Sequence, residues 1–225
     1  MAQNVPLIQH PSGIDQKIVD KVVSRRERLY AFPVLNLSKT ALVVIDLDMG
    51  TGRDDEVQVA SISENINSLA SALRSSGGRM AWVTTPMEKA TDNFRAVFGD
   101  AFADLHEANG KSGKSDTIWP ELEYRTDDIR VTKRGHSAFF PGKSDLHQRL
   151  QAEGVESILI VGAVTNVCCE ASARDAAELQ YKVTLISDAL IGWSEEQSQA
   201  TFATFFRCYG DVRPSVEMVQ LIKEG

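Results

Sequence analysis

The sequence predicts an α/β protein in which helices cover both faces of a parallel sheet, a three-layer α/β/α domain. Apolar runs of strand length alternate with amphipathic stretches along the chain, which is typical of repeated βα units. Three of these runs, at residues 41–46, 157–162 and 182–187, consist almost entirely of β-branched residues and leucine, as expected for strands buried on both faces. In such sheets the functional residues gather beyond the carboxyl ends of the strands.

Six strands are predicted, of which the last is the weakest. They cover residues 41–46, 79–84, 128–133, 157–162, 182–187 and 211–213. Helical patterns separate them, at residues 56–75, 145–153, 166–180 and 195–209. Residues 88–115 form the longest irregular region, for which we predict a loop or a partial lid over the site.

The chain is divided into an N-terminal arm, residues 1–37, and one domain, residues 38–225. In the arm, residues 14–30 place Ile14, Ile18 and Val22 at helical spacing and predict a helix. This helix either docks on its own domain or swaps onto a neighbouring subunit, and the first alternative is favoured.

Composition excludes several classes of protein. The 225 residues carry 24 Lys and Arg against 31 Asp and Glu, a net charge of −7, which argues against a nucleic-acid partner. The apolar runs are too short to span a membrane, and the first residues lack the pattern of a secretory signal. Three cysteines, two of them adjacent, do not indicate a disulfide framework. We therefore expect a cytoplasmic protein with no membrane partner.

Three predicted strands end in side chains that can act together in catalysis. Asp46 ends the first, Lys133 ends the third, and Cys168 follows the fourth at the start of a predicted helix. Each alone is explained by a structural role: a cap, a surface charge or a small buried residue. Their shared position favours an activated nucleophile with its base. The helix N-terminus and the nearby ammonium are expected to favour the Cys168 thiolate.

The sequence gives little support for a cofactor. The four histidines are scattered, without the spacing of metal ligands, and no glycine-rich phosphate-binding motif is present. We therefore predict neither a metal nor another cofactor. His136 acts either as an acid–base group or as a hydrogen-bonding wall of the pocket, and the second role is favoured.

The segments ALVVIDLD, VTKRGHSAFF and VGAVTNVCCEASARDA resemble the isochorismatase-like cysteine hydrolase superfamily, over residues 40–212. The resemblance implies a six-stranded parallel sheet in the order 3-2-1-4-5-6. It implies a catalytic trio of Asp46, Lys133 and Cys168, and a cis peptide bond between Ala163 and Val164. The backbone amides of Val164 and Cys168 would then form the oxyanion hole.

Departures from the family pattern reduce the number of activities that the resemblance implies. Members that hydrolyse the vinyl ether of isochorismate do not need a thiol, so Cys168 favours covalent amide chemistry. Nicotinamidase-like members carry a D-x-H metal motif, whereas this chain has VTTPMEKATDNF. The HSAFF and TNVCCE segments resemble the branch that acts on ureido or carbamoyl compounds. Asp48 stands where relatives commonly have Gln. It either lies at the mouth of the pocket or caps a turn ahead of Gly50 without meeting the substrate.

The sequence therefore predicts a metal-independent cysteine amidohydrolase that cleaves a small amide or ureide through an acyl intermediate on cysteine. Vinyl-ether hydrolysis and a catalytically inert binding or scaffold protein are the alternatives. We assign Asp48, His136, Phe139 and Asn166 to substrate binding. A homo-oligomer, either a dimer or a tetramer, is expected.

Overall fold

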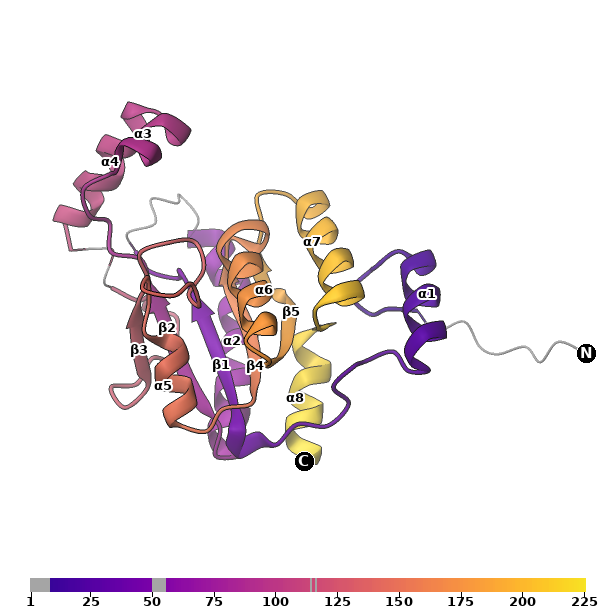
Figure 1. Ribbon diagram of the computed structural model, residues 1–225. Coiled ribbons are helices and arrows are strands. Elements are labelled where there is room, and N and C mark those ends of the chain that lie inside the picture. Colours follow the sequence, from indigo (N-terminus) through magenta and orange to yellow (C-terminus); the bar gives the residue numbers. More distant parts are fainter. Residues whose placement is uncertain (1–8, 50–55, 114, 116) are drawn as a thin grey trace, which may run out of the picture.

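The computed structural model in Figure 1 describes residues 9–49, 56–113, 115 and 117–225. Six strands form one parallel sheet in the order β3-β2-β1-β4-β5-β6, which confirms the predicted fold and strand order. The strands are β1 (Thr40–Ile45), β2 (Arg79–Thr84), β3 (Ile129–Thr132), β4 (Ser157–Ala163), β5 (Lys182–Ile191) and β6 (Asp211–Arg213). All six predicted strands are therefore present.

Helices cover both faces of the sheet, so the molecule has three layers (Figure 1). One face is packed by α1 (Gln16–Arg26), α5 (Leu146–Ala152), α6 (Glu170–Glu178) and α7 (Glu195–Cys208). The other face is packed by α2 (Glu56–Ser75) and α8 (Ser215–Glu224). A short 3₁₀ turn, η1 (Leu37–Lys39), leads into β1.

The central strand β1 explains why its sequence is a continuous apolar run. Ala41, Val43 and Ile45 pack in one hydrophobic core, whereas Leu42 and Val44 pack in the other. Alternate side chains of a strand point to opposite faces, and here both faces are covered. Each buried Val, Leu or Ile side chain contributes roughly 1.5–3 kcal/mol to stability.

At the end of β4, Gly162 lies too close to β1 to carry a side chain. A Cβ atom at this position would lie 2.1 Å from the carbonyl oxygen of Ile45. Its φ of +118° also belongs to a region that residues with side chains rarely adopt. The glycine therefore allows the turn after β4, which carries Cys168, to approach the end of β1, which carries Asp46.

The N-terminal arm docks on its own domain, as the favoured alternative predicts. Arg25 of α1 donates a hydrogen bond of 2.8 Å to the Arg207 carbonyl in α7. Asp211 of the edge strand β6 accepts hydrogen bonds from the backbone amides of Ala31, at 2.7 Å, and Phe32, at 2.8 Å. These contacts tie the arm to one edge of the sheet. The division of the chain at residue 37 stays a prediction.

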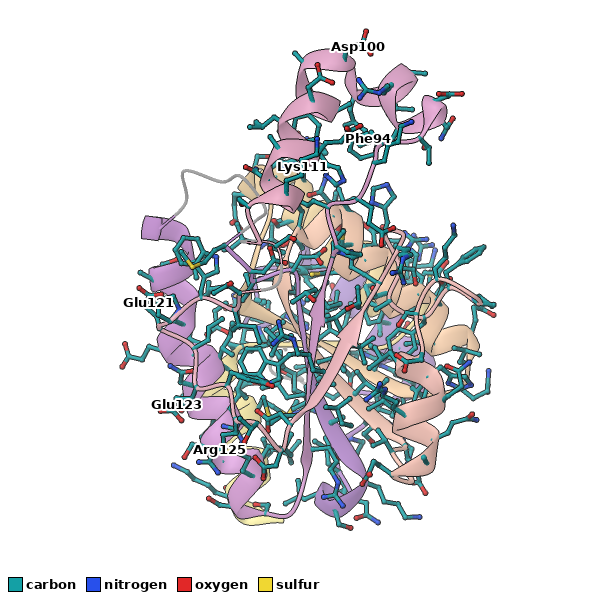
Figure 2. All side chains as sticks on the ribbon, turned by 90° about the vertical axis from the view of Figure 1, so that its left-hand side faces the viewer. Phe94, Asp100, Lys111, Glu121, Glu123 and Arg125 are labelled. Carbon is teal, nitrogen blue, oxygen red and sulfur yellow. The ribbon has the colours of Figure 1, made fainter. Side chains whose placement is uncertain are left out.

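The prediction of an irregular region at residues 88–115 is wrong. Two helices, α3 (Asp92–Phe98) and α4 (Asp100–Lys111), form a hairpin that projects from the domain (Figures 1 and 2). Phe98 and Phe102 are 40% and 51% exposed, so their side chains do not follow the pattern of a helix packed on a sheet. The signal that was present is Thr91, whose hydroxyl caps α3 by accepting a hydrogen bond from the amide of Phe94.

Two further differences concern helices. The predicted helix at residues 166–180 begins instead with a π-helical turn, η3 (Thr165–Cys169), and only then continues as α6. The C-terminal helix α8 was not predicted.

Among the described residues, no helix has both the length and the apolar character needed to cross a membrane.

We expect Gly162→Ala to lower the free energy of unfolding by more than about 3 kcal/mol, because the added methyl group overlaps Ile45 and the backbone conformation disfavours a side chain. Urea denaturation measures the change. Gly154→Ala is the matched control, since Gly154 has a φ of +69° but nothing lies within 4 Å of an added Cβ. Its expected cost is about 1–2 kcal/mol. Equal losses in the two variants would contradict the steric argument.

Candidate active site

Four strand ends bring four functional side chains to the carboxyl edge of the sheet. Asp46 follows β1, Thr85 follows β2, Lys133 follows β3, and Cys168 lies in the turn after β4. Because β3, β2, β1 and β4 are consecutive neighbours in the sheet, these side chains meet. The structure thus brings together the three residues predicted from the sequence and adds Thr85.

Asp46 and Lys133 form a buried ion pair. Lys133 Nζ lies 2.8 Å from Asp46 Oδ2, and the two side chains are 2% and 7% exposed. The backbone of Asp46 has a φ of 52°, a left-handed conformation that Asp tolerates better than most residues. Its amide donates a hydrogen bond of 2.9 Å to the carbonyl of Val83 in β2. The loss of either charge would leave the other buried without compensation.

The ammonium group of Lys133 is surrounded by hydrogen-bond acceptors. Besides Asp46, it donates to Thr85 Oγ1 at 2.8 Å and to the Gly135 carbonyl at 3.1 Å. Its distance to Cys168 Sγ is 3.5 Å. The Thr85 hydroxyl in turn donates to Asp46 Oδ1 at 2.9 Å. The acid, the ammonium and the thiol therefore belong to one hydrogen-bonded network.

This network determines the protonation state of the thiol. Burial lowers the pKa of Lys133, but attraction to Asp46 and Cys168 outweighs burial and raises that pKa above its ordinary value. Burial and the Asp46 carboxylate raise the pKa of Cys168 to about 12, against the opposite effect of Lys133. The resting thiol is therefore protonated at neutral pH. The expected preference for the thiolate is wrong, because burial and Asp46 outweigh the ammonium.

The turn η3 presents Cys168 and hides its neighbour. The peptide bond between Ala163 and Val164 is cis, which confirms what the resemblance implies. The Val164 carbonyl accepts hydrogen bonds from the amides of Val167, at 3.1 Å, and Cys169, at 3.2 Å. Cys169 is fully buried in the hydrophobic core, whereas Cys168 is partly exposed. Cys168 is therefore the cysteine of this turn that solvent and a substrate can reach.

Two of the predicted substrate-binding residues lie at or near the thiol. His136 is exposed, and its Nδ1 atom lies 3.9 Å from Cys168 Sγ. Asn166 lies in the same turn as Cys168, and its Nδ2 donates to Gln197 Oε1 at 3.2 Å. Among the described residues, Asn166 Oδ1 is buried and has no hydrogen-bond partner. Their contact with a substrate stays a prediction.

The other two predicted substrate-binding residues are buried. Phe139 is 4% exposed, and its ring lies 5.8 Å from that of Tyr181 in the hydrophobic core. Asp48 is 0% exposed and pairs with Ile118 in a short antiparallel bridge, so it does not lie at an open pocket mouth. The contact of Phe139 and Asp48 with a substrate stays a prediction.

Thr85 is the member of the network that the sequence analysis missed. A threonine after a strand is ordinary, because β-branched residues are common there. The available signal was its position, since Thr85 follows the strand that pairs with both β1 and β3. A side chain at that strand end lies between Asp46 and Lys133, and this can be recognised only once the strand order is known.

The fold and the site define a class of protein, a three-layer α/β/α domain with a buried Asp–Lys pair beside a cysteine at the carboxyl edge of its parallel sheet. The model of one family, described as the isochorismatase domain, matches residues 40–215. This chain therefore belongs to the isochorismatase family of hydrolases.

Several relatives agree with this assignment. The isochorismatase family protein YwoC of Bacillus subtilis is 30% identical over 193 residues, 84% of this chain and 97% of that protein. Ureidoacrylate amidohydrolase RutB of Rhizobium rhizogenes is 26% identical over 180 residues, 69% of this chain and 71% of that protein.

Two solved structures share the fold. A cysteine hydrolase from Pseudomonas syringae pv. phaseolicola has a TM-score of 0.76 and 24% identity, covering 88% of this chain and 98% of its own. N-carbamoylsarcosine amidase from Thermoplasma acidophilum has a TM-score of 0.63 and 20% identity, covering 79% of this chain and 96% of its own. At these identities the similarity shows the fold alone.

We expect Lys133→Met to slow the alkylation of Cys168 by iodoacetamide at pH 9 at least tenfold, because the ammonium favours the thiolate over the thiol. A tenfold change corresponds to about one unit of thiol pKa. The matched control is Arg134→Met, which removes the next cation along the chain, an exposed residue paired with Glu88 on the surface. An unchanged rate in Lys133→Met would show that the ammonium does not act on the thiol.

Proposed function

We propose that this chain is a metal-independent cysteine amidohydrolase that cleaves a small non-peptide C–N bond in a ureido, carbamoyl or carboxamide group. The observation that carries the proposal is the position of the Cys168 thiol, 3.5 Å from Lys133 Nζ and hydrogen-bonded to Asp46. A thiol with an adjacent base can attack a carbonyl carbon and form a covalent acyl intermediate.

In the first half of the reaction, Asp46 accepts the S–H proton while the sulfur of Cys168 bonds to the carbonyl carbon. The tetrahedral intermediate then collapses and the C–N bond breaks. Asp46 returns the proton to the nitrogen, which leaves as an amine or ammonia. Lys133 keeps its proton throughout, and its charge holds the carboxylate and the sulfur in position.

We assign the stabilisation of the carbonyl oxygen to the backbone amides of Val164 and Cys168. Negative charge develops on this oxygen as the sulfur attacks, and fixed N–H groups directed at it stabilise the transition state. In comparable sites the loss of one such donor costs about 3–4 kcal/mol of transition-state stabilisation.

The second half of the reaction regenerates the thiol. A water molecule loses a proton to Asp46 while its oxygen bonds to the acyl or carbamoyl carbon. The C–S bond breaks as the intermediate collapses, and the sulfur recovers a proton from Asp46. The products are the acid, or a carbamate that decomposes, and the enzyme in its initial state.

Two observations support a ureido or carbamoyl substrate. The names of RutB, a ureidoacrylate amidohydrolase, and of N-carbamoylsarcosine amidase both denote carbamoyl-bearing substrates of those proteins. In this chain, the buried Oδ1 atom of Asn166 has no partner among the described residues, and a carbamoyl group offers N–H donors that such an acceptor requires. His136 supplies a further polar contact beside the thiol.

Vinyl-ether hydrolysis is the first alternative, and a catalytically inert binding or scaffold protein is the second. Ether hydrolysis does not need a thiol, so the position of Cys168 beside Asp46 and Lys133 favours amide chemistry. The presence of all three side chains in one network disfavours an inert site. The homo-oligomer, as a dimer or a tetramer, and the cytoplasmic location stay predictions.

We expect Cys168→Ala and Cys168→Ser to abolish ammonia release from a panel of ureides, carbamoyl amines and carboxamides, because no acyl intermediate can form. Cys169→Ala is the matched control and keeps most activity, since its thiol lies in the core. Acid-quenched wild-type enzyme should carry the acyl mass on Cys168 in tandem mass spectrometry. Turnover of the panel by Cys168→Ala would overturn the covalent mechanism.

The predicted independence from a metal requires its own test. Among the residues that the structure describes, no group of three or more His, Cys, Asp or Glu side chains is placed to hold a metal ion. We expect full activity after exhaustive dialysis against a chelator, compared with the same enzyme dialysed against buffer. A loss of activity that Zn²⁺ or Fe²⁺ restores would show that a metal takes part.

A further inference from the structure

Lys133 Nζ has more hydrogen-bond acceptors around it than it has N–H donors. An ammonium group has three N–H donors. Four acceptors lie around Lys133 Nζ: Asp46 Oδ2 at 2.8 Å, Thr85 Oγ1 at 2.8 Å, the Gly135 carbonyl at 3.1 Å and Cys168 Sγ at 3.5 Å. The sulfur is the most distant of the four, so the three N–H groups serve the oxygens while Cys168 is a neutral thiol.

The Thr85 hydroxyl has a fixed direction in this network. It has one O–H donor, which it gives to Asp46 Oδ1 at 2.9 Å. Its oxygen therefore accepts from Lys133, and Thr85 forms a second link between the two ions, through Asp46 Oδ1. The Asp46 carboxylate therefore accepts from Thr85 through Oδ1 and from Lys133 through Oδ2.

We propose that Thr85 is a positioning residue that keeps the proton on Cys168 until the substrate is attacked, and orients Asp46 to deliver that proton to the leaving nitrogen. The proposal rests on the proposed function insofar as it takes Cys168 as the nucleophile. While the thiol is protonated, Thr85 stabilises the Asp46 carboxylate and occupies one N–H of Lys133.

Transfer of the proton changes the partners within the network but not its total charge. The S–H bond breaks and an O–H bond forms on Asp46, while Lys133 stays an ammonium. The negative charge thus moves from the carboxylate to the sulfur. A Lys133 N–H released from Thr85 can then turn to the thiolate, which is a stronger acceptor than a hydroxyl.

The titratable groups that face the thiol come from two strand ends and one loop. Among the described residues, Asp46 faces it from the end of β1, Lys133 from the end of β3 and His136 from the loop after β3. Thr85 forms hydrogen bonds with the first two, so its effect on Cys168 is transmitted through them.

The test compares Thr85→Val with Thr85→Ser and with Thr132→Val. Valine keeps the shape of threonine and removes the hydroxyl, whereas serine keeps the hydroxyl. Thr132 lies at the end of β3, in register with Thr84, and serves as the matched control at the same edge of the sheet. Each variant is measured for iodoacetamide alkylation of Cys168 at pH 8, for kcat and KM, and for urea stability.

We expect Thr85→Val to be alkylated at least threefold faster than the wild type, because the loss of one donor to Asp46 and the release of a Lys133 N–H both favour the thiolate. Its kcat should fall about tenfold, with KM changed less than twofold, because the protonated Asp46 is no longer oriented. Thr85→Ser and Thr132→Val should match the wild type in the rate of alkylation and in kcat and KM.

Tandem mass spectrometry distinguishes a more reactive Cys168 from a locally unfolded turn. Cys169 is fully buried and becomes alkylated only if the turn opens. Alkylation of Thr85→Val that is unchanged, slower, or accompanied by modification of Cys169 would overturn the proposal, as would equal changes in Thr132→Val. The alkylation measurement needs no substrate, so it decides the role of Thr85 even if no C–N bond in the panel is cleaved.

Discussion

The buried ion pair between Asp46 and Lys133 is the constraint on which the rest of the site depends. Moving two ions out of water costs several kcal/mol each, and their mutual attraction compensates only when their other hydrogen bonds are made. Here Thr85 and the Gly135 carbonyl supply those bonds. The pair is therefore tolerated because the ends of three neighbouring strands, β1, β2 and β3, converge on it.

The same pair decides how the cysteine is activated. A carboxylate and an ammonium side by side present almost no net charge to the sulfur, so burial controls the thiol and raises its pKa to about 12. A free thiolate would be exposed to oxidation and alkylation, and a protonated thiol is not. In the mechanism that we propose, the proton leaves the thiol at the moment of attack, and the neighbouring Asp46 accepts it.

Much of the fold and part of the site could be predicted from the sequence. Continuous apolar runs located β1 and β4 because both faces of the sheet are covered there, whereas the edge strands β3 and β6 are short and carry polar residues. Asp46, Lys133 and Cys168 stood out because each lies at or after the end of a predicted strand. The helices α3 and α4 were missed because their apolar side chains are not packed on the sheet. The protonated state of Cys168 was missed because burial is a property of the assembled site, and no motif displays it.

The buried ion pair and the residues that we propose to bind the substrate lie on different parts of the fold. Asp46 and Lys133 are buried, and each is fixed by the end of a strand, so their relative positions follow from the sheet. His136 lies instead on the loop after β3, and Asn166 lies with Cys168 in the turn η3, so neither belongs to a strand of the sheet. Substrate preference in this chain should accordingly depend on the two residues beside the thiol more than on the buried pair.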